Sequence, residues 1–387
     1  MTDVAAPKLV ELFCGGGGFS RGAHNAGFEV AAAYDIDPIL SSSYPLNFPD
    51  TKLFHRDVGP LTGAQIEEDI GQRPFGIFGG PPCQGFSDIG KRDKADPRRK
   101  LLGHFFRVVS EAEPAFFVME NVRGLAYADS RPVLDDALKY VTGKYHILGP
   151  HIWDSSEFGA ATKRNRMFVI GIHKDRGAPL TLADVEGHKT KPASVKRAIA
   201  DLADAHPIEA SDDLPGFDRW QIRRRGQPSD YAWVLRSVDN VFTGHRATAH
   251  TQAVVERFGK VKPGKIDSVG RHPRLKWGGL CPTLRAGTGS DFGSYQSVRP
   301  IHPDEDRVIT VREAARLQGF PDRHVFHPTI WHSFRMIGNS VSPMMAEAIF
   351  LAVRQRLGLP MPGETAEATY AEADRGEALD ELLEAAE

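Results

Sequence analysis

Short apolar runs alternate with stretches of helical periodicity over the first 172 residues of the chain. The run Lys8–Phe13 leads into a glycine-rich turn, and the next run, Phe28–Tyr34, ends at two aspartates. The remaining expected strands are Phe75–Phe78, Ala115–Met119 and Arg166–Ile172, and the stretches with helical spacing are Phe19–Ala26 and Leu101–Ala112. Strands that alternate with helices predict an α/β fold built on a parallel, doubly wound sheet.

The pattern weakens after Ile172. Residues 173–300 are richer in glycine, proline, arginine and polar residues, and the strands they suggest are short. Such a change in composition indicates a second, smaller domain that is inserted into the first.

Regular helical signals return near the C-terminus. Thr310-Val-Arg-Glu313 is a capping box ahead of a helix that ends at Gly319. Ser342-Pro343 starts another helix, which runs to about Leu357. We therefore predict a main domain of residues 1–172, an inserted domain of residues 173–300, a return to the main domain over 301–360 and an acidic, disordered tail over 361–387.

Composition adds information about partners and cysteine chemistry. The apolar content of 41% and the charged content of 25% are typical of a globular protein. The start of the chain lacks the features of a signal peptide, so we expect a cytoplasmic protein that does not span a membrane. The three cysteines, Cys14, Cys83 and Cys281, are far apart and form no CxxC. Neither a disulfide framework nor a metal site is therefore expected.

Charge is unevenly distributed along the chain. The whole chain carries −2, but residues 364–387 hold nine acidic residues and one basic residue, so the rest carries −2 + 8 = +6. Residues 219–276 hold thirteen Lys/Arg and four Asp/Glu. Such a basic block fits a surface that faces phosphates, although a solvated face would give the same count.

The glycine turn, Gly15–Gly18, lies between a strand and a helix, where backbone amides can surround a ligand. Asp35 ends the second strand, where a carboxylate can hold ribose hydroxyls. The dinucleotide pattern GxGxxG is incomplete, because its last position falls on Ser20 or Arg21. A nucleoside cofactor without a pyrophosphate fits better than NAD, and a purely structural turn is the alternative.

Cys83 lies in the sequence Gly79-Gly-Pro-Pro-Cys-Gln-Gly-Phe-Ser87, just after the carboxyl end of an apolar strand. Ligands bind at that edge of open α/β sheets. The two prolines stiffen the approach, so the thiol is presented from a fixed backbone. We interpret Cys83 as a nucleophile rather than a buried structural cysteine.

Glu120 follows the apolar run Ala115–Met119, so it should reach the same rim of the sheet as Cys83. Burial there should raise the pKa of its carboxyl group and allow it to donate a proton. A structural carboxylate is the alternative.

Positions 162, 164 and 166 of the segment Thr162-Lys-Arg164-Asn-Arg166 share one face of an extended chain. Two guanidinium groups on that face suit a phosphate, a carboxylate or a base carbonyl.

Together these groups fit one reaction better than any of them does alone. A thiolate that adds to C6 of cytosine, with N3 protonated by an acid, makes C5 nucleophilic enough to take a methyl group from a sulfonium donor. A base must then remove the C5 proton so that elimination can release the cysteine. The target base of a duplex has to be flipped out for this chemistry.

The motifs resemble those of the bacterial type of cytosine-C5 DNA methyltransferase family, and their order along residues 8–172 and 273–357 is the family's. The matching segments are LFCGGGGFSRG, PPCQGFS, MENV, TKRNR, RVITVREAARLQGFPD and IGNSV. The resemblance implies a Rossmann-like, S-adenosylmethionine-dependent methyltransferase sheet with an inserted, smaller target-recognition domain. It also implies base flipping and DNA methylation within a restriction-modification system.

The resemblance also implies a role for each matching residue. Cys83 is implied as the nucleophile, Glu120 as the proton donor to N3, Arg166 as the contact to cytosine O2, and Arg164 as support for Cys83 or a phosphate. The implied S-adenosyl-L-methionine pocket consists of Phe13, Gly15, Gly17, Gly18, Asp35, Ile36, Asp57, Val58, Pro82, Leu101, Asn339 and Val341. Ser87 and Arg98, in a loop of residues 84–99 that would close over the DNA, and the pair Thr283-Leu284 are implied as DNA contacts.

Two positions depart from the family pattern. Thr162 stands where the family usually has glutamine, and Asp35 where it usually has glutamate. The first departure affects contacts that a glutamine would make, and the second shortens the reach of the carboxylate. Neither removes a chemical group that the reaction requires.

We therefore predict a monomeric enzyme that methylates cytosine at C5 within a specific sequence of double-stranded DNA, with a cognate restriction endonuclease as a functional partner. Three alternatives remain open. A tRNA cytosine-C5 methyltransferase would share the catalytic core, but its characteristic Cys-Phe-Thr motif is absent. A catalytically silent DNA-binding protein would most naturally lack Cys83 or Glu120. An NAD-dependent dehydrogenase is disfavoured by the incomplete glycine pattern.

Overall fold

The chain is built around a seven-stranded sheet with the strand order β3-β2-β1-β4-β5-β7-β6. The computed structural model describes residues 7–82, 100–223, 228–287 and 298–362. The strands of this sheet are β1 (Lys8–Leu12), β2 (Glu29–Asp35), β3 (Lys52–His55), β4 (Gly76–Gly79), β5 (Phe116–Asn121), β6 (Tyr145–Asp154) and β7 (Asn165–His173).

The sheet is parallel from β3 to β5 but not at its other edge. The strand β7 runs antiparallel to both β5 and β6. The expectation of a wholly parallel sheet is therefore wrong for β7. The physical reason is the short connection between β6 and β7, residues 155–164, which can join antiparallel neighbours but is too short for a crossover between parallel strands.

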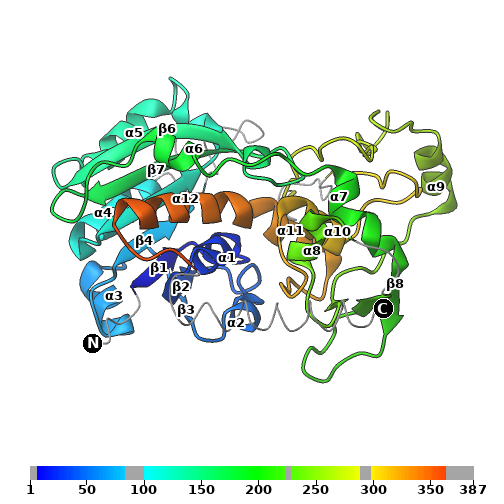
Figure 1. Ribbon diagram of the computed structural model, residues 1–387, viewed down its shortest axis with the longest axis horizontal. Coiled ribbons are helices and arrows are strands. Elements are labelled where there is room, and N and C mark those ends of the chain that lie inside the picture. Colours follow the sequence, from blue (N-terminus) through cyan, green and yellow to red (C-terminus); the bar gives the residue numbers. More distant parts are fainter. Residues whose placement is uncertain (1–6, 83–99, 224–227, 288–297, 363–387) are drawn as a thin grey trace, which may run out of the picture.

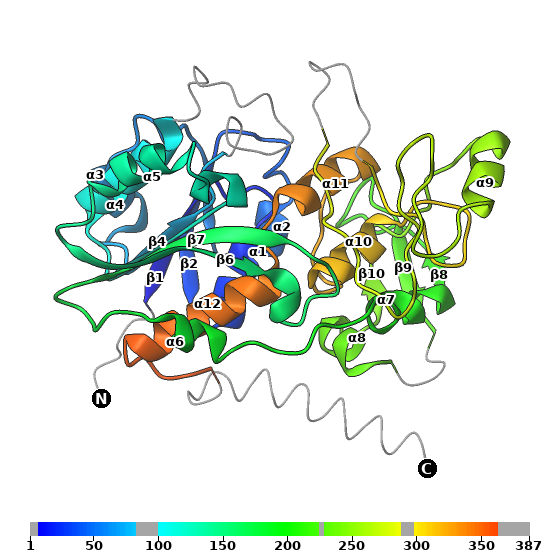
Figure 2. The ribbon, with the colours of Figure 1, turned by 90° about the horizontal axis from the view of Figure 1, so that it is seen from above.

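Helices cover both faces of this sheet, as Figure 2 shows. Side chains of β5 alternate between the two layers: Phe116 and Val118 face one, and Phe117 and Met119 face the other. The first layer contains α1 (Gly18–Asn25), α6 (Leu182–Glu186) and α12 (Pro343–Arg356), and the second contains α3 (Gly63–Ile70), α4 (Lys100–Ala112) and α5 (Arg131–Leu138). The further short elements of this lobe are α2 (Tyr44–Asn47), η2 (Arg123–Ala126) and η3 (Ser155–Glu157).

The glycine turn is pressed against the C-terminal part of the chain. A Cβ on Gly18 would lie 2.5 Å from the carbonyl oxygen of Val341, and one on Gly22 would lie 2.3 Å from Cβ of Ala346. Only glycine permits such a close approach of α1 to the start of α12. This contact fixes the turn before α1 relative to a segment that lies more than 300 residues later.

A second lobe, on the right in Figures 1 and 2, contains the antiparallel sheet β10-β9-β8. Its core joins Ile199, Leu235 and Ile222 to Ala314 and Phe334 from the C-terminal helices. The elements of this lobe are α7 (Val195–Ile199), η4 (Ala200–Asp204), β8 (Ala205–Ile208), β9 (Arg219–Ile222), α8 (Asp230–Leu235), β10 (Val241–Phe242), α9 (Gln252–Gly259), α10 (Val311–Gln318) and α11 (Ile330–Asn339).

The packing moves the predicted domain boundaries at residues 173 and 301. Val185 of α6 lies in the same core as Ile349 of α12, and Asp184 pairs with Arg356. The chain therefore leaves the first lobe after α6. The helices α10 and α11 pack against α7 and α8, so the return to the first lobe comes near α12. Boundaries shift in this way because a helix belongs to the core that buries its apolar face.

The two predicted C-terminal helices are confirmed, including their ends. The hydroxyl of Thr310 accepts a hydrogen bond from the amide of Glu313, and Gly319 ends α10 in the left-handed region at φ 90°. Pro343 occupies the first turn of α12, and Gly358 follows that helix with φ 66°. Local capping chemistry was sufficient to predict these ends.

One apolar stretch, Ile330–Arg356, has the length and composition of a membrane span, and 78% of its most apolar 18-residue segment is buried inside the fold. It comprises α11 and α12, and the backbone between them is extended at Ser340 and Ser342. The stretch therefore serves as two core helices of this fold.

A buried carboxyl group lies under the glycine turn. Glu11 of β1 accepts hydrogen bonds from the hydroxyl groups of Ser20 and Tyr44. Burial raises the pKa of Glu11 to about 8, and the two hydroxyl donors offset only part of that rise. The side chain is therefore mostly protonated at neutral pH.

We expect Glu11→Gln to flatten the pH dependence of folding stability. A carboxyl group whose pKa is raised by folding contributes most below the unfolded value of 4.5, and this contribution is lost as pH rises towards about 8. Glutamine resembles the protonated acid and does not titrate. Urea unfolding should therefore show similar stabilities near pH 4.5 and a more stable variant at pH 8. Equal pH slopes for the two proteins would contradict this account.

Candidate active site

Three strand ends meet at one rim of the large sheet. Because β1, β4 and β5 are neighbours, the glycine turn after β1, the segment Gly80–Pro82 after β4 and Glu120 at the end of β5 lie side by side. This agrees with the rim predicted from the sequence. Cys83, Ser87, Arg98 and the rest of the loop 84–99 lie outside the described residues.

Glu120 is the carboxyl group at this rim, and it is 7% exposed. Its Oε1 accepts a hydrogen bond from Nε of Arg166 at 2.7 Å. A Cβ on Gly80 would lie 2.8 Å from the other carboxyl oxygen, so the side chain touches the backbone three residues before Cys83. Burial raises the pKa of Glu120 above 4.5, although the guanidinium groups of Arg166 and Arg164 act in the opposite direction.

Asn121 has a structural role that the sequence did not reveal. Its side-chain amide donates a hydrogen bond to the carbonyl of Pro81 at 3.0 Å, and its Oδ1 accepts from the amide of Val122 at 2.9 Å. The asparagine is buried, so these bonds are shielded from water. It fixes the approach to Cys83 relative to Glu120.

The two arginines of the TKRNR segment have different surroundings. Arg166 faces Glu120 and pairs with its carboxyl group. The guanidinium group of Arg164 is fully buried and donates to the carbonyls of Leu284, at 3.2 Å, and Gly338, at 2.6 Å. Arg164 is therefore held by the backbone at these two positions, and its predicted role as support for Cys83 or a phosphate stays a prediction.

The two residues of the pair Thr283-Leu284, which are expected DNA contacts, also differ in exposure. The hydroxyl of Thr283 donates to the carbonyl of Lys163 at 2.7 Å, and Thr283 is exposed. Leu284 is 3% exposed and packs in the core of the second lobe, so its side chain makes no surface contact. The hydroxyl of Thr162, at the position where the family usually has glutamine, donates to the carbonyl of Cys281 at 3.2 Å. This threonine therefore connects the two lobes.

Asp35 lies next to the glycine turn. Its carboxylate accepts hydrogen bonds from the amides of Gly15 and Asp37, both at 2.8 Å. Burial raises the pKa of Asp35, and these two amide donors lower it by less. Ile36 beside it is 68% exposed, which is unusual for an isoleucine at the end of a buried strand. An exposed apolar side chain beside a carboxylate with free lone pairs suits the adenine and ribose of a nucleoside.

The other expected cofactor residues differ in backbone conformation and in exposure. Phe13 has a φ of 61°, a conformation that costs energy for a residue with a side chain and often marks a functional site. Asp57 is exposed and accepts a hydrogen bond from the amide of Gly59. Val58 and Val341 are buried, Pro82 and Leu101 are partly buried, Asn339 is exposed, and Gly15 and Gly17 have positive φ.

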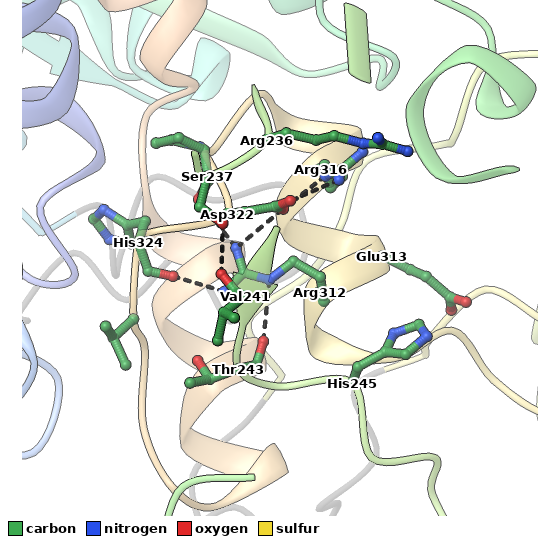
Figure 3. A network of polar contacts seen from close by, with 12 residues as sticks. Arg236, Ser237, Val241, Thr243, His245, Arg312, Glu313, Arg316, Asp322 and His324 are labelled. Carbon is green, nitrogen blue, oxygen red and sulfur yellow. Dashed lines mark hydrogen bonds and ion pairs between the residues drawn. The ribbon is translucent and has the colours of Figure 1, made fainter. Parts of the chain in front are cut away.

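A buried ionic network in the second lobe was missed by the sequence analysis (Figure 3). Arg316 donates to both carboxylate oxygens of Asp322, at 2.7 and 2.6 Å, and to those of Asp201 at 3.2 Å. Its backbone carbonyl accepts from the hydroxyl of Tyr231 at 2.7 Å. Spacing alone could not reveal this network, because the sequence pattern of buried charges resembles that of solvated ones. Within the described ranges, no group of three His, Cys, Asp or Glu side chains could hold a metal ion.

Comparisons with known proteins identify the family of the chain. The profile of the family described as C-5 cytosine-specific DNA methylase matches residues 7–355. The chain is 39% identical to the type II methyltransferase M.XorII of Xanthomonas oryzae pv. oryzae, over 89% of this chain and 83% of that protein. It is 29% identical to the type II methyltransferase M.DdeI of Desulfomicrobium norvegicum, over 88% and 87%.

Two solved structures resemble the fold. One is the crystal structure of a presumed DNA modification methyltransferase encoded within a prophage (E. coli), with a TM-score of 0.74, 35% identity and coverage of 91% of this chain and 99% of that one. The other is the S. pombe Dnmt2 methyltransferase, with a TM-score of 0.59, 17% identity and coverage of 91% and 98%. At that identity, the second likeness concerns the fold alone.

Proposed function

Because the chain belongs to the C-5 cytosine-specific DNA methylase family, we propose that Cys83 and Glu120 carry out the family's reaction at the rim of the large sheet. The protein is a DNA cytosine-5 methyltransferase with the S-adenosylmethionine-dependent methyltransferase fold, and DNA is its substrate. The observation that supports this assignment of residues is the buried carboxyl group of Glu120, held between Arg166 and the backbone at Gly80.

The thiolate of Cys83 forms a bond with C6 of a cytosine that has been flipped out of the duplex. Glu120 delivers a proton to N3, which is possible because burial keeps its carboxyl group protonated to a higher pH than usual. S-adenosylmethionine, when bound, supplies the methyl group. Loss of the C5 proton to a base then expels the Cys83 thiolate from C6, and the proton on N3 returns to the carboxylate of Glu120, which leaves neutral 5-methylcytosine.

Neighbouring residues orient these two groups. Arg166 places its guanidinium group beside Glu120, where it can contact O2 of the cytosine. Arg164 and Asn121 act through the backbone, because Arg164 fixes the carbonyls of Leu284 and Gly338, and Asn121 fixes that of Pro81.

The residues of the glycine turn fit a nucleoside cofactor. The carboxylate of Asp35 would hold the ribose hydroxyls, and the exposed side chain of Ile36 would lie against the adenine. The rest of the proposed pocket is Phe13, Gly15, Gly17, Gly18, Asp57, Val58, Pro82, Leu101, Asn339 and Val341.

The second lobe is proposed as the target-recognition domain, with its basic stretch 219–276 directed at the DNA. Ser87 and Arg98 are proposed contacts to the phosphates of the flipped nucleotide, and Thr283, of the Thr283-Leu284 pair, is proposed as a DNA contact of the target-recognition domain. Since the curated relatives are named type II methyltransferases, we also propose that the enzyme works as a cytoplasmic monomer alongside a cognate restriction endonuclease.

Transfer of tritium from labelled S-adenosylmethionine tests this function directly. We expect the label to enter unmethylated bacterial genomic DNA and to be recovered as 5-methylcytosine, with no incorporation above background into bulk tRNA. Label in tRNA alone would favour the RNA-modifying alternative. Binding to DNA without any transfer would favour the catalytically silent one.

A further inference from the structure

The glycine turn is held by a histidine from the other end of the chain. Nε2 of His324 lies 2.9 Å from the carbonyl oxygen of Gly16, and the imidazole is fully buried against the rings of Phe48 and Phe320. Burial and the guanidinium group of Arg21 hold the pKa of His324 well below its usual range. A neutral ring carries one N–H, so the contact with a carbonyl places that proton on Nε2.

The backbone of the same histidine is bound by Arg312 of α10 (Figure 3). The guanidinium group of Arg312 donates to the carbonyl of His324 at 2.8 Å, to that of Pro321 at 3.0 Å and, through Nε, to that of Thr243 at 3.0 Å. The amide of Arg312 also donates to the carbonyl of Gly244 at 2.8 Å. Thr243 and Gly244 directly follow β10, so the hydrogen bonds of Arg312 to these two carbonyls connect it to the small sheet.

These contacts form a continuous buried path between the two lobes. It leads from the carbonyl of Thr243 through the guanidinium group of Arg312 and the backbone of His324 to the carbonyl of Gly16. Arg312 is 1% exposed, so water cannot replace a hydrogen bond that is lost there. Because protein interiors are close-packed, a displacement at Thr243 must be absorbed by the neighbours along this path.

We propose that His324 is a positioning residue for the cofactor, and that the link between Arg312 and His324 couples DNA binding by the second lobe to the geometry of the glycine turn. The proposal rests on the function proposed above, because it takes the glycine turn as part of the cofactor pocket and the second lobe as the DNA reader. By thermodynamic reciprocity, DNA raises the affinity for S-adenosylmethionine by the factor by which the cofactor raises that for DNA.

The test measures the dissociation constant of S-adenosylmethionine by calorimetry, with and without unmethylated bacterial genomic DNA. In the native enzyme, the dissociation constant measured without DNA divided by that measured with DNA should lie within about 5 to 150, the range of typical coupling. His324→Phe removes the donor to Gly16 and should weaken cofactor binding by about tenfold without DNA. His324→Gln can place an amide N–H near the position of Nε2 and should restore most of the affinity.

Arg312→Lys separates coupling from direct positioning. It keeps a positive charge but cannot donate to three carbonyls at once. We expect the cofactor affinity without DNA to stay within about threefold of the native value and the ratio of the constants to fall towards one. If His324→Phe does not fold, His324→Asn replaces it, since its shorter amide cannot reach Gly16.

His245→Phe is the matched control. His245 is another buried imidazole of the same lobe, and it contacts the hydroxyl of Thr310 at 3.0 Å rather than the glycine turn. The His245→Phe substitution should lower the melting temperature of the protein and leave its affinity for S-adenosylmethionine unchanged. Native affinity and a native ratio in the folded His324 and Arg312 variants would overturn the proposal. A native enzyme that binds no S-adenosylmethionine would overturn the proposed function instead.

Discussion

Replacement of Cys83 by alanine should abolish methyl transfer, with a loss of at least about 10⁴-fold, as expected when the nucleophile of a covalent mechanism is removed. The addition of sulfur to C6 is what makes C5 reactive, and the other proposed groups cannot replace it. Steady-state transfer of labelled methyl groups to unmethylated genomic DNA measures the loss.

The same variant should lose a covalent adduct. DNA that contains 5-fluorocytosine traps the native enzyme, because the fluorine at C5 cannot leave as a proton does, so the bond between sulfur and C6 persists. The native protein should shift on a denaturing gel in the presence of S-adenosylmethionine, and the Cys83→Ala variant should not.

Cys281→Ala provides the matched control for this experiment. Cys281 is buried, and burial raises its pKa to about 12, so its thiol is neither accessible nor ionised. The control should form the adduct and retain most of the activity. Adduct formation by Cys83→Ala, or its loss in Cys281→Ala alone, would refute the assigned nucleophile.

Replacement of Glu120 by glutamine should lower the turnover number by about 10² to 10⁴-fold, the usual contribution of a general acid. The amide is similar in shape and can still bond to Arg166, but it cannot deliver a proton to N3. Binding of S-adenosylmethionine should change little, because Glu120 is not among the proposed cofactor residues. The reduction should therefore appear in the turnover number rather than in the KM for the cofactor.

The pH dependence gives a second measure of the role of Glu120. Burial raises the pKa of this carboxyl group, so the protonated donor persists above 4.5 and is lost as pH rises further. As pH rises above the pKa of Glu120, the turnover number of the native enzyme should fall, and that of Glu120→Gln should not. Glu347→Gln is the control, because burial also raises the pKa of Glu347, which bonds to Asn25 away from the rim. An unchanged turnover number in Glu120→Gln would exclude Glu120 as the acid.

Local patterns predicted much of the large sheet. The runs that became β1, β4 and β5 are apolar because both faces of these strands are covered by helices, and this burial leaves a continuous apolar signal in the sequence. The adjacency of Glu120 to the segment before Cys83 followed from the same signal, since neighbouring parallel strands end at one edge. The strand β6 gave a weaker signal, because it is the edge strand and most of its residues are only partly buried.

The two arginines Arg164 and Arg166 show where this reasoning stopped. They lie two residues apart and looked equivalent in the sequence, yet Arg166 pairs with Glu120 while Arg164 is buried between Leu284 and Gly338. The partners of Arg164 are 120 and 174 residues away along the chain. Spacing cannot indicate which carbonyl a buried guanidinium group will meet.

The sequence by itself determined the main strands of the large sheet other than β3 and β6, the caps of α10 and α12, the rim at which β4 and β5 end and the family of the enzyme. These depend on short-range periodicity and on residue types that one kind of chemistry requires. Only the tertiary structure decided that β7 runs antiparallel, that Leu284 lies in a core, and that His324 and Arg312 connect the glycine turn to the small sheet. The direction of β7 depends on its short connection to β6. The other outcomes depend on how segments as far apart as Gly16 and His324 pack, and packing satisfies buried polar groups with whichever partners the assembled fold brings within reach.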